Sequence, residues 1–442
     1  MKDYEAFRNA LFDIALRNGC TAAETYRQEE VNFSVGVLDQ AIDTYSVSRT
    51  AGIGLRVQAD GRNGYAYTEA MDQPEELVRH ALDNARSVET RDEHPMQTPQ
   101  TYPALAAPGD PLCGLDEPEK IALAMRMERL VLDSGDPIVK SAENQLQTTR
   151  RTISIHNTRG LAAEESSEDS ILFAYPVAKR GEEIRDAYAF RCGSDDIAAV
   201  AAEACEKAAA KLGAAPVPPG RYRILLQYEA ASTLLDAFTP MFSADQVQRG
   251  LSPLAGREGT AIASPAVRIV DDPFHPVHPR AFDAEGTPSQ RTMLVEDGIL
   301  RSLLHNLKTA KKAGVSSTSN AGRASAASPV GVAPSNLHIV PGTPGFDELV
   351  KRLGDGLIIT EMSGTHAGVN TISGDFSLLS GGFLVEGGHV VRPVDQITVA
   401  GTFFSLMSGV LAVGSDLRFG FPGASRIGSP SLLVESLTVA GQ

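Results

Sequence analysis

The first residues that could do chemistry are Tyr228, Glu229 and Thr233, which open a helix-compatible run directly after the apolar segment 224–226. A zinc-peptidase helix placed after a strand carries a His-Glu pair and a later His on one face. The histidines bind the metal and the glutamate activates water. Here only the glutamate is present, and neither a phenol nor a neutral hydroxyl is a good zinc ligand. Glu229 is therefore either an acid at a helix start or part of a degenerate catalytic site.

The histidines offer one further candidate for metal binding. Of the nine in the chain, only His275 and His278 are close together, beside Asp271 and Asp272. Prolines at positions 273, 276 and 279 exclude a regular helix there, so the spacing is not that of a helical ligand pair. An extended loop of this composition could bind a divalent ion, and it could equally be an inert surface loop. None of the four cysteines follows Cys205, so the C-terminal half has no thiolate ligand.

A glycine-bounded stretch around Gly374, Asp375 and Phe376 is a candidate for binding peptide. Glycine at strand boundaries allows another backbone to approach closely, and an extended peptide can add to such a sheet edge. A tight hairpin packed inside a barrel is the alternative interpretation. A Gly-x-Ser-x-Gly nucleophile elbow is absent from the sequence.

The periodicity of apolar residues predicts the helices and strands that position these candidate site residues. A helix, an antiparallel meander and a second helix are expected over about 3–88, and the same order recurs over about 116–212. Within the first meander the pattern predicts separate short strands at 24–28 and 31–37. Beyond a proline-containing linker at 214–220, short glycine-bounded strands predict a β-rich sandwich or barrel-like domain. We expect an α+β protein with units at 1–93, 94–213 and 220–442.

Composition narrows the function classes. Forty Lys and Arg against 55 Asp and Glu give a formal charge of −15, which does not favour direct binding of nucleic acid. No run reaches the roughly 20 apolar residues that a membrane span needs. The N-terminus leads into an amphipathic pattern and not into an apolar signal core, and the cysteines lack disulfide spacing. These features predict a cytoplasmic protein.

Several short motifs together make the sequence resemble the TldD/PmbA family, and within it the PmbA (TldE) branch. The resemblance extends over nearly the whole chain. The motifs that carry it are Gly52–Val57, Gln248–Gly259, Ala263–Pro265, Val270–Pro273, Thr287–Arg291, Gly374–Ser377 and Ile397–Gly401.

The resemblance implies a role for the unusual helix. TldD-type members look like zinc metallopeptidases with a His-Glu-x-x-x-His helix and a Cys ligand from the C-terminal domain. Matching the shared glutamate puts Tyr228 and Thr233 at the two histidine positions, and the missing Cys agrees. The implied protein has no zinc of its own and pairs with a zinc-bearing TldD-type chain to degrade or process unfolded peptides. Without that partner it could form a homodimer. Members of the family have also been labelled modulators of DNA gyrase.

Two other functions stay open at this stage. One is an independent metal-dependent peptidase that uses Glu229 with His275 or His278. The other is a non-enzymatic regulatory binding protein.

Overall fold

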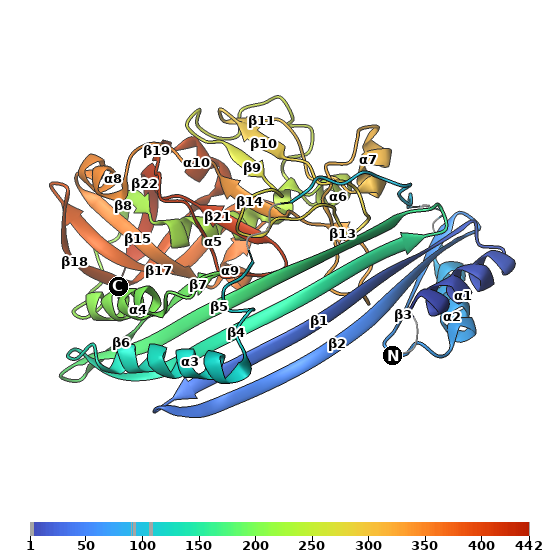
Figure 1. Ribbon diagram of the computed structural model, residues 1–442. Coiled ribbons are helices and arrows are strands. Elements are labelled where there is room, and N and C mark those ends of the chain that lie inside the picture. Colours follow the sequence, from blue (N-terminus) through green and yellow to red (C-terminus); the bar gives the residue numbers. More distant parts are fainter. Residues whose placement is uncertain (1–3, 90, 92–93, 106–108, 442) are drawn as a thin grey trace.

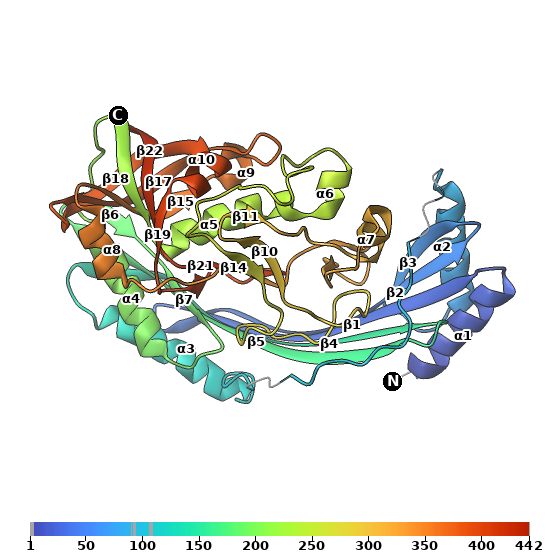
Figure 2. The same cartoon turned by 90° about the horizontal axis from the view of Figure 1, so that it is seen from above.

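A computed structural model describes residues 4–89, 91, 94–105 and 109–441. It is an α+β structure in which a long curved sheet cradles a β-rich C-terminal domain (Figures 1 and 2). The expected boundary at residue 93 lies outside the described residues. Within the described ranges, no helix is both long and apolar enough to cross a bilayer.

The N-terminal half contains the helix, meander and helix order twice. Its first elements are α1 (Tyr4–Arg17), β1 (Ala22–Leu38), β2 (Ala41–Ala59), β3 (Arg62–Thr68) and α2 (Pro74–Ser87). The second set is α3 (Glu117–Leu132), β4 (Ile138–Asn157), β5 (Ala162–Arg180), β6 (Glu183–Asp186), β7 (Ala189–Cys192) and α4 (Ile197–Ala210).

Both sets contribute to one sheet of order β3-β2-β1-β4-β5-β6, with β7 also on β5. The junction is the antiparallel pairing of β1 with β4, which begins at Glu24 opposite Asn157. Apolar side chains of all four helices pack on one face of this sheet. The opposite, concave face receives the C-terminal domain (Figure 2).

Strand β1 is continuous where the sequence pattern predicts two strands, at 24–28 and 31–37. The pattern breaks at the polar residues Glu29 and Glu30, directly after Gln28. In the folded sheet Glu30 forms an ion pair with Arg151 of β4, whose Nε lies 2.5 Å from Glu30 Oε1. The side-chain amide of Gln28 donates a hydrogen bond to the same carboxylate. These contacts satisfy the polar side chains, so the strand runs through a stretch that the hydrophobic pattern alone assigns to a turn.

The tip of the β1–β2 hairpin is attached to the second repeat. Asp39 and Gln40 have positive φ angles of 52° and 57°, as a tight hairpin turn requires. Their backbone N–H groups donate to the carboxylate of Glu128 on α3, at 2.9 and 2.7 Å. The turn and the helix of the neighbouring repeat therefore fix each other.

The C-terminal domain is a barrel with an attached second sheet. The barrel strands are β8 (Gly220–Leu226), β15 (Gly356–Ser363), β16 (Val369–Asn370), β17 (Asp375–Glu386), β18 (His389–Thr402), β19 (Val410–Val413) and β22 (Leu432–Gly441). The second sheet contains β9 (Ile269–Asp271), β10 (Thr292–Glu296), β11 (Ile299–Leu300), β14 (Asn336–Ile339), β20 (Arg418–Phe419) and β21 (Arg426–Ser429). A separate ribbon pairs β12 (Ala321–Gly322) with β13 (Gly331–Val332).

Strand β15 closes the barrel because it pairs with β8 on one side and with β17 on the other. The core contains Phe238 beside Phe403, with ring centroids 5.2 Å apart, and Phe376 next to them. The helices of this domain are α5 (Tyr228–Phe238), η1 (Thr239–Phe242), α6 (Ala244–Gln248), α7 (Leu307–Ala313), α8 (Phe346–Leu353), α9 (Thr365–Gly368) and α10 (Phe403–Ser408).

A buried ion cluster joins the first strands to the C-terminal domain. Its members are Glu24, Arg56, His94, Glu285 and Arg323, whose side chains are at most 5% exposed. Arg56 Nη2 lies 3.0 Å from Glu24 Oε1, and Arg323 Nη2 lies 3.5 Å from the same oxygen. Glu285 contacts His94 and lies 3.9 Å from Arg56. Basic and acidic side chains from three parts of the chain thus meet in a buried interface.

Candidate functional site

Helix α5 begins immediately after the barrel strand β8, as the sequence predicts. The apolar residues 224–226 fill the strand, and Gln227 donates its N–H to Ile359 O at 2.9 Å before the helix starts at Tyr228. Within the helix, the Thr233 hydroxyl donates to the Glu229 carbonyl at 2.8 Å. The Thr233 side chain therefore bonds to its own helix.

Tyr228 is 9% exposed and lies among charged groups. Its hydroxyl donates to Glu203 Oε1 at 3.2 Å and accepts from Arg418 Nη1 at 3.0 Å. The Arg418 guanidinium carbon is 4.7 Å from the centre of the tyrosine ring, a cation–π contact. Burial, together with the charges of Glu229 and Glu203, raises the pKa of Tyr228, so the phenol stays neutral.

Glu203 of α4 is the centre of this group of charges. Lys207 Nζ lies 3.0 Å from Glu203 Oε1, Arg418 Nη1 lies 3.1 Å from Oε2, and Arg191 contacts the carboxylate as well. Burial alone would raise the pKa of Glu203, but the bond from Arg191 and the charges of Lys207 and Arg418 lower it to about 2. Glu203 is therefore ionised at neutral pH.

Glu229 is joined to the same group through Lys207, whose Nζ lies 2.6 Å from Glu229 Oε1. We call the six residues the α5 cluster. They are Arg191, Glu203, Lys207, Tyr228, Glu229 and Arg418. Three cations and two carboxylates meet here, from α4, α5, β7 and β20.

A cavity of about 350 Å³ opens beside the α5 cluster, and His275 is among its lining residues. The His275 ring packs against Phe419 and His338, with centroids 4.8 and 5.4 Å away. Burial and the neighbouring His338 lower the pKa of His275. His275 Nδ1 also accepts a hydrogen bond from the N–H of Val277, at 3.2 Å, so Nε2 is the ring nitrogen that this bond does not use.

His278 belongs to a different contact. Its Nδ1 lies 3.2 Å from Asp169 Oδ1, and Arg426 Nη2 lies 2.6 Å from the same oxygen. Burial would raise the pKa of Asp169, but the bonds and charges of His278 and Arg426 hold it well below its usual range. Among the described residues, no group of three or more His, Cys, Asp or Glu side chains is arranged to hold a metal ion.

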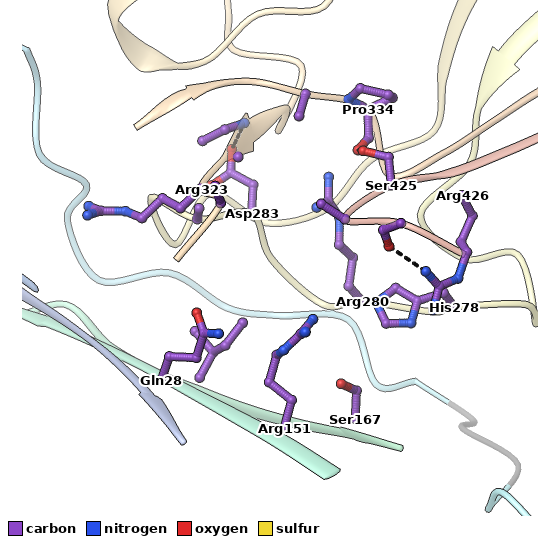
Figure 3. A pocket seen from close by; sticks show the side chains of 18 of the residues that line it. Gln28, Arg151, Ser167, His278, Arg280, Asp283, Arg323, Pro334, Ser425 and Arg426 are labelled. Carbon is purple, nitrogen blue, oxygen red and sulfur yellow. Dashed lines mark hydrogen bonds between the residues drawn. The ribbon is translucent and has the colours of Figure 1, made fainter. Parts of the chain in front are cut away.

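A larger cavity, of about 740 Å³, lies between the concave face of the sheet and the loops of the C-terminal domain. Figure 3 shows Gln28, Arg151 and Ser167 on the sheet, across from Arg280 and His278 on the loops. Arg426 lines both this cavity and the smaller one beside α5. The two cavities therefore adjoin.

The candidate peptide residues lie in paired backbone. Asp375 and Phe376 pair with Thr402 and Gly401 of β18 on one side, and with β16 on the other. Phe376 is 3% exposed and belongs to the barrel core, and Gly374 has a φ of +83° in the turn before the strand. A peptide strand could pair here only by displacing β16.

Sequence reasoning singled out Tyr228, Glu229 and Thr233 and missed their partners. Arg418 is far along the chain from Tyr228, and Glu203 and Lys207 lie on a helix that reads as an ordinary amphipathic element. The spacing of Glu203 and Lys207, four residues apart, was the one available signal of an ion pair.

Three consecutive parts of the chain match known domains. Residues 23–85 match the PmbA/TldA metallopeptidase domain 1, residues 110–212 the central domain, and residues 219–441 the C-terminal domain. This chain belongs to the PmbA/TldD family of metallopeptidases.

Individual relatives agree with this assignment. A metalloprotease of Methanothermobacter thermautotrophicus is 27% identical over 88% of this chain and 86% of its own length. The crystal structure of a protein from Thermotoga maritima, proposed to modulate a DNA gyrase, is 31% identical and superposes with a TM-score of 0.90 over 99% of this chain and all of that one. TldE of Thermococcus kodakarensis, 19% identical, has the same fold, with a TM-score of 0.90 over 98% of this chain and all of that one. Other relatives carry metalloprotease names of both the PmbA and the TldD kind.

Proposed function

We propose that this chain is the PmbA/TldE-type subunit of a cytoplasmic two-chain metallopeptidase, and that a TldD-type chain supplies the zinc. The observation that carries the proposal is the α5 cluster. At the helix start where a zinc peptidase has its first ligand, the Arg418 guanidinium lies over the Tyr228 ring and donates to its hydroxyl. The positive charge of Arg418 therefore lies beside the position that a metal ion would occupy.

Electrostatics explains why zinc does not fit these residues. A divalent cation beside Arg418 and Lys207 would be repelled by both side chains. Repulsion between like charges a few ångströms apart is strong where water is partly excluded. Thr233 has its hydroxyl bonded to a backbone carbonyl, and the Tyr228 phenol is held neutral. Glu229 Oε1 is in an ion pair with Lys207 Nζ, at 2.6 Å, so this oxygen already has a cation as its partner.

The chain's own contribution would be to hold substrate. The large cavity between sheet and barrel loops would receive part of an extended peptide while another part reaches the zinc of the partner. Such a site favours unfolded substrates, because the backbone groups of folded proteins are already paired.

The test is to purify this chain alone, the TldD-type chain alone and the two together, and to measure bound zinc and cleavage of an unfolded peptide. We expect less than stoichiometric zinc and no cleavage for this chain alone, and cleavage by the pair. One tightly bound zinc per chain together with cleavage by the isolated chain would refute the proposal. Failure of the two chains to associate would favour a regulatory binding protein.

An independent peptidase remains the second candidate, because Glu229 and His275 line the same cavity. It predicts metal-dependent cleavage by the isolated chain that Glu229→Gln abolishes. Glu361→Gln is the matched control, since Glu361 forms a similar ion pair with Lys211, at 2.7 Å, away from that cavity.

A further inference from the structure

One arginine in the large cavity between the sheet and the C-terminal domain differs from the others. The cavity is lined by four arginines, and three of them are in ion pairs. These pairs are Arg151 with Glu30, Arg323 with Glu24 and Arg426 with Asp169. The fourth is Arg280, which is in no ion pair with any residue that the structure describes.

The Arg280 guanidinium has few partners of any kind. Its Nη2 makes one long hydrogen bond, to the Ser319 carbonyl at 3.5 Å, and its Nε is buried without a hydrogen-bond partner. In Figure 3 the side chain lies between Arg151 on the sheet and Pro334 on the opposite wall. A cation that is partly removed from water is stabilised by an anion beside it. Arg280 can therefore bind an anion that enters the cavity.

The carboxylates in the cavity wall bind other groups. Glu165 accepts the backbone N–H of Ala281 at 2.7 Å, and Asp283 accepts that of Ala321 at 3.0 Å. Burial raises the pKa of both carboxyl groups, which weakens their negative charge. Neither acid is within ion-pair distance of Arg280, so the wall does not supply its counter-ion.

The surroundings of Arg280 favour a carboxylate over a phosphate. A guanidinium matches the planar geometry of a carboxylate and can donate two parallel hydrogen bonds to it. Asp169 lines the same cavity, and its pKa is held well below the usual range, so its negative charge would repel a doubly charged phosphate group. The apolar side chains of Tyr26, Ile153 and Phe282 also line the cavity. A single negative charge attached to an apolar group fits this lining.

We propose that Arg280 binds a carboxylate of the peptide substrate inside the large cavity. Two parts of a peptide carry this group, namely its C-terminus and the side chains of its Asp and Glu residues. The cavity volume of about 740 Å³ is in the range of sites that enclose small ligands, so it can receive a short segment of a peptide. The inference deepens the proposed function and rests on it for the class of ligand.

Three short peptides that each contain one tryptophan test the proposal. They are acetyl-Gly-Trp-Ala-Leu with a free C-terminus, the same peptide with a C-terminal amide, and acetyl-Gly-Trp-Glu-Leu amide. The chain contains no tryptophan, so the fluorescence anisotropy of the peptide measures binding to the full-length protein without an added dye. We expect a peptide with a carboxylate to bind about tenfold or more tightly than the neutral amide. Comparison of the free acid with the Glu peptide shows which carboxylate Arg280 binds.

Substitution of the arginine assigns the preference to this side chain. Arg280→Gln should raise the Kd of the carboxylate peptide about tenfold or more and leave that of the neutral amide unchanged. Arg150→Gln is the matched control, because Arg150 forms an ion pair with Glu168, at 2.8 Å, and does not line the cavity. It should leave both Kd values unchanged. Circular dichroism confirms that each variant is folded.

Several results would overturn the proposal. They are equal Kd values for the three peptides, no binding of any of them, and an Arg280→Gln variant that keeps the preference for a carboxylate. Displacement of the peptide by inorganic phosphate, at concentrations where acetate has no effect, would assign the cavity to phosphate and also overturn it.

The binding measurement separates this inference from the proposed function, because it uses this chain without zinc and without a TldD-type chain. If the pair cleaves peptide but this chain shows no preference for a carboxylate, only the role of Arg280 is wrong. If the preference is present but the pair cleaves nothing, Arg280 binds peptide carboxylates and the proposed peptidase is wrong.

Discussion

The buried ion cluster and the α5 cluster both pair arginine with glutamate, but their surroundings differ. Arg56 and Glu285 of the buried cluster are at most 1% exposed, so each charge there depends on its partners. In the α5 cluster Arg418 is 45% exposed, so water helps to stabilise its charge. A charge that is excluded from water must be balanced by opposite charges within the protein. Near water, several charges of one sign can lie close together and determine the local electrostatic potential.

The largest effect should come from breaking the buried cluster. Arg56→Met removes the cation 3.0 Å from Glu24 and leaves a carboxylate without water and with only the longer contact to Arg323. We expect a loss of about 3–5 kcal/mol in the free energy of unfolding, measured in urea. Arg79→Met, at an exposed ion pair, is the control and should cost about 0.5 kcal/mol or less. Equal losses for the two variants would mean that burial does not decide how much these ion pairs contribute to stability.

Glu203→Gln should have the next largest effect. Losing the charge-assisted bonds to Arg191, Lys207 and Arg418 should cost about 2 kcal/mol at neutral pH. The folded-state pKa of about 2 lies below the unfolded value, so this stability is present above the unfolded pKa and is lost as pH falls to about 2. Urea unfolding of both proteins between neutral pH and pH 2 should show the difference shrinking below about pH 4. A difference independent of pH would exclude ionised Glu203 as its cause.

Tyr228→Phe removes a single hydroxyl from the α5 cluster. The hydroxyl bonds to Glu203 and Arg418 are lost, while the ring and its cation–π contact remain. We expect a loss of about 1 kcal/mol in thermal or urea unfolding. Tyr67→Phe, whose hydroxyl contacts Glu69 on the surface, is the control and should change stability by a few tenths of this. A larger loss at Tyr67 would reverse the ranking of the two sites.

Thr233→Val should have the smallest effect of the four. Its hydroxyl bonds only to the Glu229 carbonyl, and such bonds within a helix contribute little. We expect a change in the free energy of unfolding of about 0.5 kcal/mol or less. A loss as large as that of Tyr228→Phe would place Thr233 among the residues that hold the α5 cluster together.

Individual strands and helix starts could be predicted from the sequence. The apolar residues 224–226 and the pattern after Tyr228 predict the strand and the helix start that the structure has. Short glycine-bounded strands likewise predict a β-rich C-terminal domain. These signals are local, because they depend on side-chain periodicity within one element.

The contacts that give the candidate site its charge could not be predicted in this way. Arg418 reaches Tyr228 only because β20 and β21 pack beside α5. The polar centre of β1 is strand because β4 pairs with it from beyond residue 137. Periodicity carries no information on which distant elements become neighbours, so the shared sheet and the α5 cluster had to come from the structure.

The position of β22 in the barrel has a consequence for synthesis on the ribosome. This strand, residues 432–441, lies between β8 and β18, and β8 is made some two hundred residues earlier. Until the later strand has left the exit tunnel, β8 lacks its antiparallel neighbour and the barrel cannot close. The strands of the curved sheet end at β7 and its last covering helix, α4, ends at Ala210, so this part can fold while the rest of the chain is translated. The nascent barrel segments would then be the part most in need of a chaperone.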